Sequence, residues 1–429
     1  MIDTLLALLK ASDIDGWEIT DTSTEGWEFY LIRHRLDQNR VRKVRHISVK
    51  VYKRLKNGTC LGSASGEMAP TLSEAEMRRQ LQDLIKAASL VENRAYTLNP
   101  RAVLTGKTPE KTDPAVTSET LLELLSSLPE TDSADMNSAE IFVDQVTRRF
   151  LTSEGTDVTT CAPKSMLEVV VNARRNGHEI ELYRLYRFGA CDREMLREDL
   201  CRALRFGPDR LTAVPTPALQ AFDVVFSTAD ACPIYRYFID RMNASMIVRG
   251  YSDWKIGQRV CEQGDGDPVT IQAVGVLPGS SVGGLLDPEG ALTCDMPVIT
   301  DSIAAHYHGS RQFRCYAEMT DGYLAQNFVV SGGHRTDDEI RSGDYLEIVE
   351  FSDFQVDTIT GDIAGEIRLG YLHKGSTVSV VTGGSVSGSM RTLARGMRMS
   401  LRQVQYDCLR IPALTRLHGV TITGCENEA

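Results

Sequence analysis

The sequence predicts an α+β protein, in which an N-terminal α/β-type domain with a long helix precedes a C-terminal domain rich in β-strands. The long helix is indicated by a capping signal at Ser73 that precedes apolar residues at helical spacing. The β-rich half is indicated by the segment 351–389, where short alternating runs are separated by glycines. A length of 429 residues favours two to three domains.

The N-terminal part is predicted as a succession of short elements. In chain order these are a helix at 2–11, strands at 17–20, 27–34 and 44–55, and a glycine-rich joint at 58–66. Ser73 can then cap a helix, because Glu76 lies three residues further on, where a capping box requires an acid or amide. The apolar stripe of this helix consists of Leu81, Leu84, Ile85 and Ala88.

A connector is expected at about 99–137, because proline, threonine, lysine and glycine dominate its first half. A short helix at 119–128 is the one regular element predicted inside it. Beyond the connector, strands at 166–173 and 178–188 flank the Asn176-Gly177 pair, which is a strong hairpin signal. Asp192 can cap a helix that continues to Leu204.

The main domain boundary is predicted near Pro217, after three prolines that interrupt the chain. The domains are therefore 1–217 and 218–429. The second begins with a strand at 222–226 and a helix at 228–245, followed mainly by short strands and glycine turns. In the segment 351–389, Phe354, Val356 and Thr358, and again Ile367, Leu369 and Tyr371, fall at period two. This segment predicts a β-built wall without a nucleophile, base or metal ligand.

The charge balance argues against a nucleic-acid surface, since the formal net charge is −11 and the sequence pI is about 5.3. The one basic run, 40–54, alternates with valine and isoleucine, which favours a strand with one solvated face. Neither a signal peptide nor a membrane span is predicted. The ten cysteines form no C-x-x-C pair, so we expect a cytoplasmic protein with reduced cysteines.

Few residues suggest chemistry by their spacing. His306, His308 and Cys315 form the closest histidine and cysteine group, and on a strand the two histidines would share a face. We favour surface or interface histidines over a metal site here. Cys232 at a helix start could be a reactive thiolate, but a buried cysteine is the simpler interpretation. Asp287 and Glu289 are explained by turn chemistry.

Two further groups are interpreted as structural. Asp337, Asp338 and Glu339 are expected in a solvated turn beside Gly332-Gly333. Gly383-Gly384 superficially resembles a phosphate loop but lacks its Lys-Ser/Thr ending, which argues against nucleotide binding.

Four stretches together resemble the TldD/PmbA family, also called modulators of DNA gyrase. They are GSASGEMAPTLSEAEMRRQLQDLIKAAS (62–89), YSDWKIGQRV with DPVTI (251–271), LLDPEGALTCDMPVI (285–299), and TGDIAGEIRLGYLHKGSTVSVVTGGSVSGS with the closing PALTRLHGVTITG. Pro288 stands where the third of these motifs more usually has an acidic residue. The resemblance extends over nearly the whole chain and implies a TldD/PmbA-like fold.

The resemblance also implies a chemistry that this chain lacks. The TldD branch is a metallopeptidase with an H-E-x-x-x-H helix, whose histidines bind zinc and whose glutamate activates water. Here the corresponding stretch is ADACPIYRYFIDRMNAS, with Tyr235, Arg236, Tyr237 and Phe238 where ligands would be needed. No histidine occurs from Glu179 to Ala305. Cys408 and Cys425 lie near the C-terminus, where the catalytic branch supplies a further zinc ligand.

The resemblance therefore implies a PmbA/TldE-like chain that helps to form the peptide-binding groove of a TldD/TldE-type complex. We expect no catalytic residues, cofactor or metal in this chain, a TldD-like catalytic subunit or a homodimer as partner, and an unfolded peptide as substrate. Direct contact with nucleic acid is not expected. Two alternatives stay open: an autonomous homodimeric metallopeptidase with unusual ligands such as His306 and His308, and a non-enzymatic scaffold. Tyr235, Arg236, Tyr237 and Phe238 would line either the core or a groove.

Overall fold

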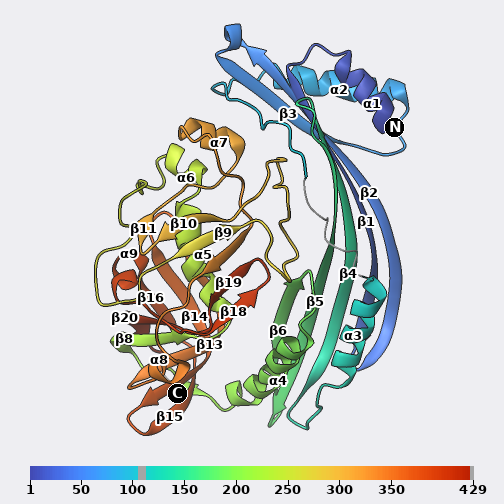
Figure 1. Ribbon diagram of the computed structural model, residues 1–429. Coiled ribbons are helices and arrows are strands. Elements are labelled where there is room, and N and C mark those ends of the chain that lie inside the picture. Colours follow the sequence, from blue (N-terminus) through green and yellow to red (C-terminus); the bar gives the residue numbers. More distant parts are fainter. Residues whose placement is uncertain (105–112, 426–429) are drawn as a thin grey trace.

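The computed structural model describes residues 1–104 and 113–425. A long curved sheet forms the N-terminal half, and its hollow side faces a more rounded C-terminal half (Figure 1). The strands of the curved sheet lie in the order β3 (Cys60–Met68), β2 (Arg35–Leu55), β1 (Gly16–Ile32), β4 (Ala134–Thr152), β5 (Asp157–Arg175) and β6 (His178–Phe188), with every pair antiparallel. Mixed α+β structure is confirmed. The α/β-type description of the N-terminal part is wrong, because its sheet contains no parallel pair in the described residues.

Helices cover one face of the curved sheet at its two ends. They are α1 (Ile2–Lys10) and α2 (Glu74–Ala88) at one end, and α3 (Pro114–Ser126) and α4 (Arg193–Arg210) at the other. Ile19 packs in a core with α1 and α2, whereas Phe29, on the same face of β1, packs in a separate core with α3 and α4. The curved sheet is therefore stabilised by an apolar core at each end, and its middle contributes few core residues.

Several predicted boundaries differ in the structure. The predicted strands at 17–20 and 27–34 are parts of one long strand, β1, and the predicted joint at 58–66 is mainly strand β3, preceded by the 3₁₀ turn η1 (Lys56–Gly58). Within the predicted connector, α3 begins at Pro114 because Asp113 caps it, and β4 begins at Ala134. The helix after Ser73 has the predicted capping box with Glu76.

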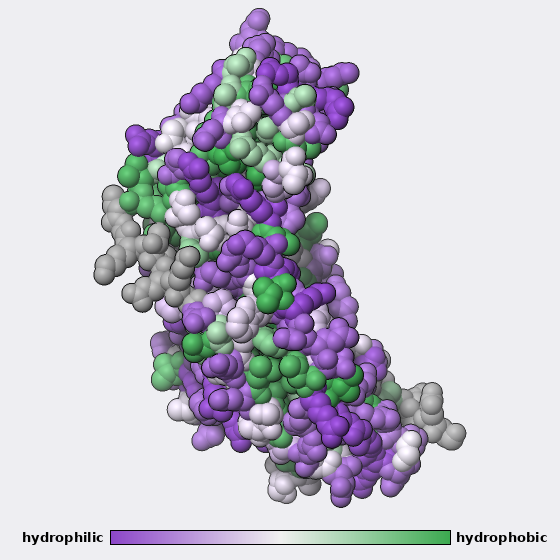
Figure 2. Space-filling model, turned by 90° about the vertical axis from the view of Figure 1, so that its right-hand side faces the viewer, coloured by the Kyte–Doolittle hydropathy of each residue, from purple (hydrophilic) through white to green (hydrophobic). Residues whose placement is uncertain are grey.

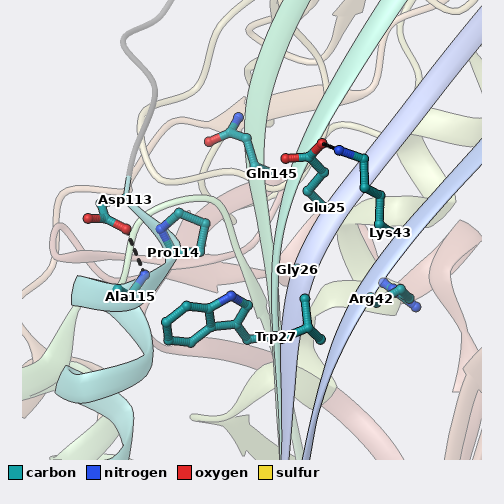
Figure 3. A pocket seen from close by; sticks show the side chains of 10 residues that line it. Glu25, Gly26, Trp27, Arg42, Lys43, Asp113, Pro114, Ala115 and Gln145 are labelled. Atoms are coloured by element: carbon teal, nitrogen blue, oxygen red, sulfur yellow. Dashed lines mark hydrogen bonds and ion pairs between the residues drawn. The ribbon is translucent and has the colours of Figure 1, made fainter.

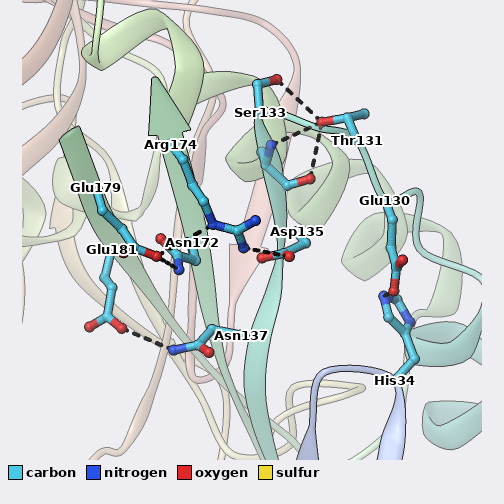
Figure 4. A network of polar contacts seen from close by, with 11 residues as sticks. His34, Glu130, Thr131, Ser133, Asp135, Asn137, Asn172, Arg174, Glu179 and Glu181 are labelled. Carbon is cyan, nitrogen blue, oxygen red and sulfur yellow. Dashed lines mark hydrogen bonds and ion pairs between the residues drawn. The ribbon is translucent and has the colours of Figure 1, made fainter. Parts of the chain in front are cut away.

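The far end of the curved sheet is joined by a polar network (Figure 4). Arg174 of β5 donates to Asp135 of β4 at 2.6 Å and contacts Glu179 of β6 at 3.4 Å. Asn137 of β4 donates to Glu181 of β6 at 3.0 Å. The network links three adjacent strands beside the β5–β6 turn, where Asn176 and Gly177 have φ values of 52° and 82°. This is the left-handed geometry that the predicted Asn-Gly hairpin requires.

The C-terminal half contains a small barrel and a second sheet. Strands β13, β8, β20, β16 and β14 follow one another by pairing, and β14 pairs back with β13, which closes the ring. The ring strands are β8 (Leu219–Phe226), β13 (Tyr345–Val356), β14 (Asp362–Lys374), β16 (Ser385–Ser389) and β20 (Thr415–Thr423). Strands β7 (Val214–Pro215), β15 (Thr377–Thr382) and β17 (Arg398–Met399) extend it. The predicted wall at 351–389 is thus confirmed as β structure.

The second sheet has the order β11, β10, β9, β12, β19, β18. Its strands are β9 (Ile271–Val274), β10 (Met296–Thr300), β11 (Ile303–Ala304), β12 (Asn327–Val330), β18 (Gln403–Tyr406) and β19 (Leu409–Pro412). The short helices of this half are η2 (Ala229–Ala231), α5 (Cys232–Arg241), α6 (Ala244–Val248), α7 (Arg311–Tyr316), α8 (Asp337–Ile340), α9 (Met390–Leu393) and η3 (Ala394–Gly396). The predicted helix at 228–245 is therefore interrupted, because Asn243 caps a new helix, α6.

Helix α5 and both sheets of the C-terminal half share one apolar core, which includes Phe226, Phe238 and Ile271. The domain boundary near Pro217 stays a prediction. Among the described residues, none of the helices has the length and apolar character that a membrane span requires.

Candidate functional site

Helix α5 occupies the place where the sequence resemblance expects a catalytic helix, and most of its side chains are core residues. Ile234 and Phe238 are fully buried. The Tyr235 hydroxyl shares a hydrogen bond of 2.7 Å with the Thr415 hydroxyl. The Tyr237 ring packs edge-on against Trp254, with ring centroids 5.7 Å apart. Of the four residues that the sequence left as core or groove, the two tyrosines and Phe238 therefore belong to the core.

Arg236 is the exception, because its side chain reaches a pocket between the two halves of the molecule. Its Nη2 donates to Sγ of Cys408 at 2.9 Å, and its guanidinium carbon lies 5.8 Å from the centroid of the Phe328 ring. Cys408 is therefore adjacent to α5, as the resemblance implies for a zinc-binding cysteine, but the side chain that contacts it is a cation. A guanidinium has no free lone pair and cannot ligate a metal.

Cys232 begins α5 and lines the same pocket. Burial raises the pKa of its thiol to about 12, so that the thiol is protonated at neutral pH. Cys232 also packs against the apolar core. These properties support a core cysteine and oppose an activated nucleophile.

We define the junction pocket as the cavity of about 300 Å³ between β6, α4, α5 and the turn that joins β18 to β19. Its polar lining residues are Tyr186, Arg187, Asp199, Arg202, Arg236, Gln405, Tyr406 and Asp407, and its apolar ones include Leu185, Phe188, Met195, Val404 and Leu409. A neighbouring hollow of about 750 Å³ shares Arg187, Phe188, Met195, Val404, Gln405 and Asp407 with it. The two cavities are therefore adjacent.

Asp230, just before α5, gives a prediction about pH. Burial, together with the nearby charge of Glu350, raises the pKa of Asp230 to about 6. The folded protein then binds this proton more tightly than the unfolded chain, so stability falls as the pH rises from about 4 to about 6. The substitution Asp230→Asn should therefore raise the free energy of unfolding by about 1–3 kcal/mol at pH 7.5, with a smaller gain at pH 4.5. Urea unfolding at both pH values tests this, and an equal effect at both would contradict it.

A second cavity, of about 450 Å³, lies between the concave face of the curved sheet and the loop that contains Gly283 and Gly284. Arg42, Asp144 and Arg148 line its sheet side. Arg148 joins the two sides, since it donates to the backbone oxygens of Asp287 at 3.2 Å and Pro288 at 2.6 Å. The concave face is therefore polar where it meets the C-terminal half.

Asp287 anchors the turn beside this cavity. Its carboxylate accepts hydrogen bonds from the backbone N–H groups of Glu289, Ala291 and Leu324 at 2.8–2.9 Å. The Glu289 carboxylate accepts from the backbone N–H of Arg311 at 2.6 Å. The turn interpretation of both acids agrees with these contacts, because the backbone uses the oxygens that an acid/base pair would need.

The histidine pair does not form a ligand set. His306 and His308 lie after β11 and not on a strand, so the expected common face is absent. Nε2 of His306 lies 3.1 Å from Asp321, whereas Nε2 of His308 lies 3.0 Å from the Ile239 carbonyl in the core, where burial lowers the pKa of His308 to about 4. Cys315 contacts the Thr97 carbonyl instead. Within residues 1–104 and 113–425, no group of three or more His, Cys, Asp or Glu side chains could hold a metal ion.

Two other sequence candidates have structural roles. Gly383 and Gly384 have φ values of 78° and 74°, and a Cβ at Gly384 would lie 2.1 Å from the Thr423 carbonyl oxygen. Asp337, Asp338 and Glu339 lie in the short helix α8 and not in a turn, and Thr336 and Glu339 make its capping box. The sequence did not single out Arg187, Arg202 or Asp407, which the fold brings together with Arg236.

Another hollow, of about 490 Å³, lies beside the start of α3 on the opposite face of the curved sheet (Figure 3). Trp27 and Val41 contribute its apolar surface. Its charged groups are already engaged, since Lys43 pairs with Glu25 at 2.6 Å and Asp113 caps α3. We therefore do not assign it a chemical role.

Comparisons with known proteins agree with the fold. Residues 220–424 match a family model described as the PmbA/TldA metallopeptidase C-terminal domain. No curated protein sequence matches the chain.

Solved structures match along the whole length of the chain. TldE from Thermococcus kodakarensis is 14% identical, with a TM-score of 0.79 over 99% of this chain and 100% of that one. A candidate modulator of a DNA gyrase from Thermotoga maritima is 14% identical, with a TM-score of 0.78 over 98% of each chain. Another from Bacteroides thetaiotaomicron is 16% identical, with a TM-score of 0.79 over 99% of this chain and 98% of that one. Residues 220–424 therefore match the C-terminal domain of the PmbA/TldD family, and the whole chain has the fold of these solved structures.

Proposed function

We propose that the chain is a non-catalytic, TldE/PmbA-like subunit that pairs with a TldD-type metallopeptidase subunit and helps to form its peptide-binding groove. The observation that carries the proposal is the contact between Arg236 on α5 and Cys408 in the β18–β19 turn, at the position where the family resemblance expects zinc ligands. A peptidase that depends on zinc needs neutral imidazole or thiolate ligands and a carboxylate beside the metal-bound water. The described part of α5 offers a guanidinium and buried aromatic rings in their place.

Cavities between the two halves of the molecule support a role in holding a peptide. The cavity between the concave sheet face and the loop around Gly283 combines a mainly polar sheet side with apolar groups of the loop, and the junction pocket and its neighbouring hollow lie along the seam between the halves. An extended peptide can bind such walls through its backbone, without catalytic side chains.

Exposed apolar residues on the β1–β2 hairpin support a subunit interface. Leu36 and Val41 are 51% and 77% exposed, and Ile32 is 58% exposed. Figure 2 views the side of the molecule that carries this hairpin, where apolar patches interrupt a mostly hydrophilic surface. Burial of such patches is a common driving force for association.

Co-expression with a family relative that carries an intact H-E-x-x-x-H helix tests the proposal. The two chains should co-purify, and only the mixture should cleave an unfolded peptide. A glutamine in place of that relative's catalytic glutamate should abolish cleavage, because the relative supplies the general base. The control variant of this chain, Arg78→Met, should leave cleavage within about twofold of the parent mixture, since Arg78 forms an exposed ion pair on α2 and lines none of these cavities.

Three outcomes would contradict the proposal. Cleavage by this chain alone, with stoichiometric zinc and loss of activity on chelation, would indicate an autonomous metallopeptidase. Binding of a folded protein without any stimulation of peptide cleavage would indicate a scaffold. Unchanged cleavage after substitution of the relative's glutamate would place the active site elsewhere.

A further inference from the structure

Arg236 carries a positive charge into the junction pocket without a direct ion pair, and the nearest charge on its own helix is that of Asp240, one turn further along α5. No carboxylate oxygen lies within 4.0 Å of its guanidinium among the described residues, and its sulfur partner, Cys408, is a weak acceptor. A guanidinium provides five N–H donors in a planar fork that matches a carboxylate. Arg236 is therefore able to bind an anionic group that enters the pocket.

Two further arginines line the same pocket with unused donor capacity. Nη2 of Arg202 donates to Asp199 at 2.6 Å, but Nε of Arg202 is buried without a partner. Arg187 on β6 is exposed and forms no ion pair with the described residues. A buried N–H group without an acceptor is costly, so a ligand oxygen that satisfied Arg202 would gain affinity.

The two carboxylates that line the pocket are already engaged. Asp199 accepts from the Tyr186 hydroxyl at 2.6 Å and from Arg202. Asp407 accepts from the backbone N–H and the hydroxyl of Ser281, at 2.7 and 2.9 Å. Asp230 precedes α5 but is not a lining residue. Three guanidinium groups therefore face two occupied carboxylates, which leaves a positive excess in a chain whose formal net charge is −11.

The rest of the lining and the volume restrict the ligand. Phe188, Met195 and Val404 provide apolar walls, and a volume of about 300 Å³ suits a small group. The neighbouring hollow of about 750 Å³ gives room for a chain that continues outward. We propose that the junction pocket binds the C-terminal carboxylate of a peptide whose last residue is apolar. The choice of a peptide as ligand rests on the proposed function.

The test measures binding to the full-length chain alone, without a catalytic partner. The probes are three fluorescently labelled pentapeptides: one ends in leucine with a free carboxylate, one has the same sequence with a C-terminal amide, and one is an amide that carries an internal glutamate. The free acid should bind at least about tenfold more tightly than either amide, since a charge-assisted hydrogen bond contributes about that much.

Arginine variants assign this preference to the pocket. Arg236→Met should remove most of the preference for the free acid, and Arg236→Lys should keep part of it, because lysine retains the charge without the fork. Arg202→Met is a second variant, which should lower the affinity for the free-acid peptide several-fold. Arg78→Met on the exposed face of α2 is the matched control and should have no effect. Circular dichroism melting curves confirm that each variant is folded.

Equal affinity for the free acid and the plain amide would overturn the proposal, as would unchanged binding by folded Arg236→Met and Arg202→Met. If the internal-glutamate amide bound as tightly as the free acid, the pocket would recognise acidic side chains and the assignment to a chain terminus would be wrong. Because no cleavage is measured, failure here with intact cleavage by the two-subunit mixture would reject only the pocket assignment. If the chain clearly preferred the free-acid peptide but did not stimulate peptide cleavage by the catalytic relative, the result would instead reject the subunit role.

Discussion

Replacing Arg416 with methionine is expected to lower the free energy of unfolding by about 3–5 kcal/mol. Arg416 on β20 is 7% exposed, and it joins β8 to the segment before β13. Its guanidinium donates to the Asp223 carboxylate at 2.7 Å and to the carbonyls of Ile340, Ser342 and Asp344 at 2.7–3.2 Å. Methionine fills a similar volume but leaves a largely buried carboxylate and three carbonyls without these donors. Urea unfolding followed by circular dichroism measures the change.

The control is Arg78→Met, which removes an exposed ion pair with Glu74 on α2 and should cost about 0.5 kcal/mol or less. His418 also contacts Asp223, at 2.5 Å, so the carboxylate keeps one partner in the Arg416 variant. If the two substitutions had equally small effects, water or His418 would be replacing the guanidinium, and the stability of the barrel would not depend on this arginine.

How much of the fold could be predicted depended on whether its signals were local. The capping box of α2 and the Asn176-Gly177 turn lie within a few residues of sequence, and both were predicted. Strand β4 was not predicted, and β1 was predicted as two separate strands. The middle of both strands is polar on the face toward the C-terminal half, as at Thr22, Thr24 and Arg148, and carries few core residues on the other. A strand segment without a buried face does not alternate apolar and polar residues, so its sequence lacks the pattern by which a strand is predicted.

The candidate site could be predicted only as far as helix α5. The sequence indicated that the residues at its ligand positions could not hold zinc, but not that Arg236 contacts Cys408, because 172 residues separate them. The junction pocket takes its lining from β6, α4, α5 and the β18–β19 turn, and none of these segments contains a motif by itself. His306 and His308 show the opposite case, in which proximity in sequence suggested a site that their different environments exclude.

Replacing Arg184 with methionine is expected to loosen the junction between the two halves and to lower the free energy of unfolding by about 3 kcal/mol. Arg184 lies on β6 of the curved sheet and Glu350 lies on β13 of the barrel. Two hydrogen bonds of 2.5 and 2.7 Å join their forked groups, and the side chains are only 15% and 13% exposed. Urea unfolding of Arg184→Met, Glu350→Met and the double variant measures the pair. The double variant should cost about 2 kcal/mol less than the sum of the single ones, since it leaves neither charge unpaired.

The matched control is Arg149→Met. Arg149 makes the same two-pronged contact with Asp157, at 2.8 Å for both bonds, but this pair is exposed and joins adjacent strands of one sheet. Its loss should cost about 1 kcal/mol or less and leave the segment 211–218 between α4 and β8 as protected from protease as in the parent. Arg184→Met should instead increase the rate of proteolysis in that segment. It should also lower the affinity of the junction pocket for its ligand, because β6 forms one wall of the pocket. Additive losses in the double variant, with unchanged proteolysis, would show that the two halves are held together by their other contacts.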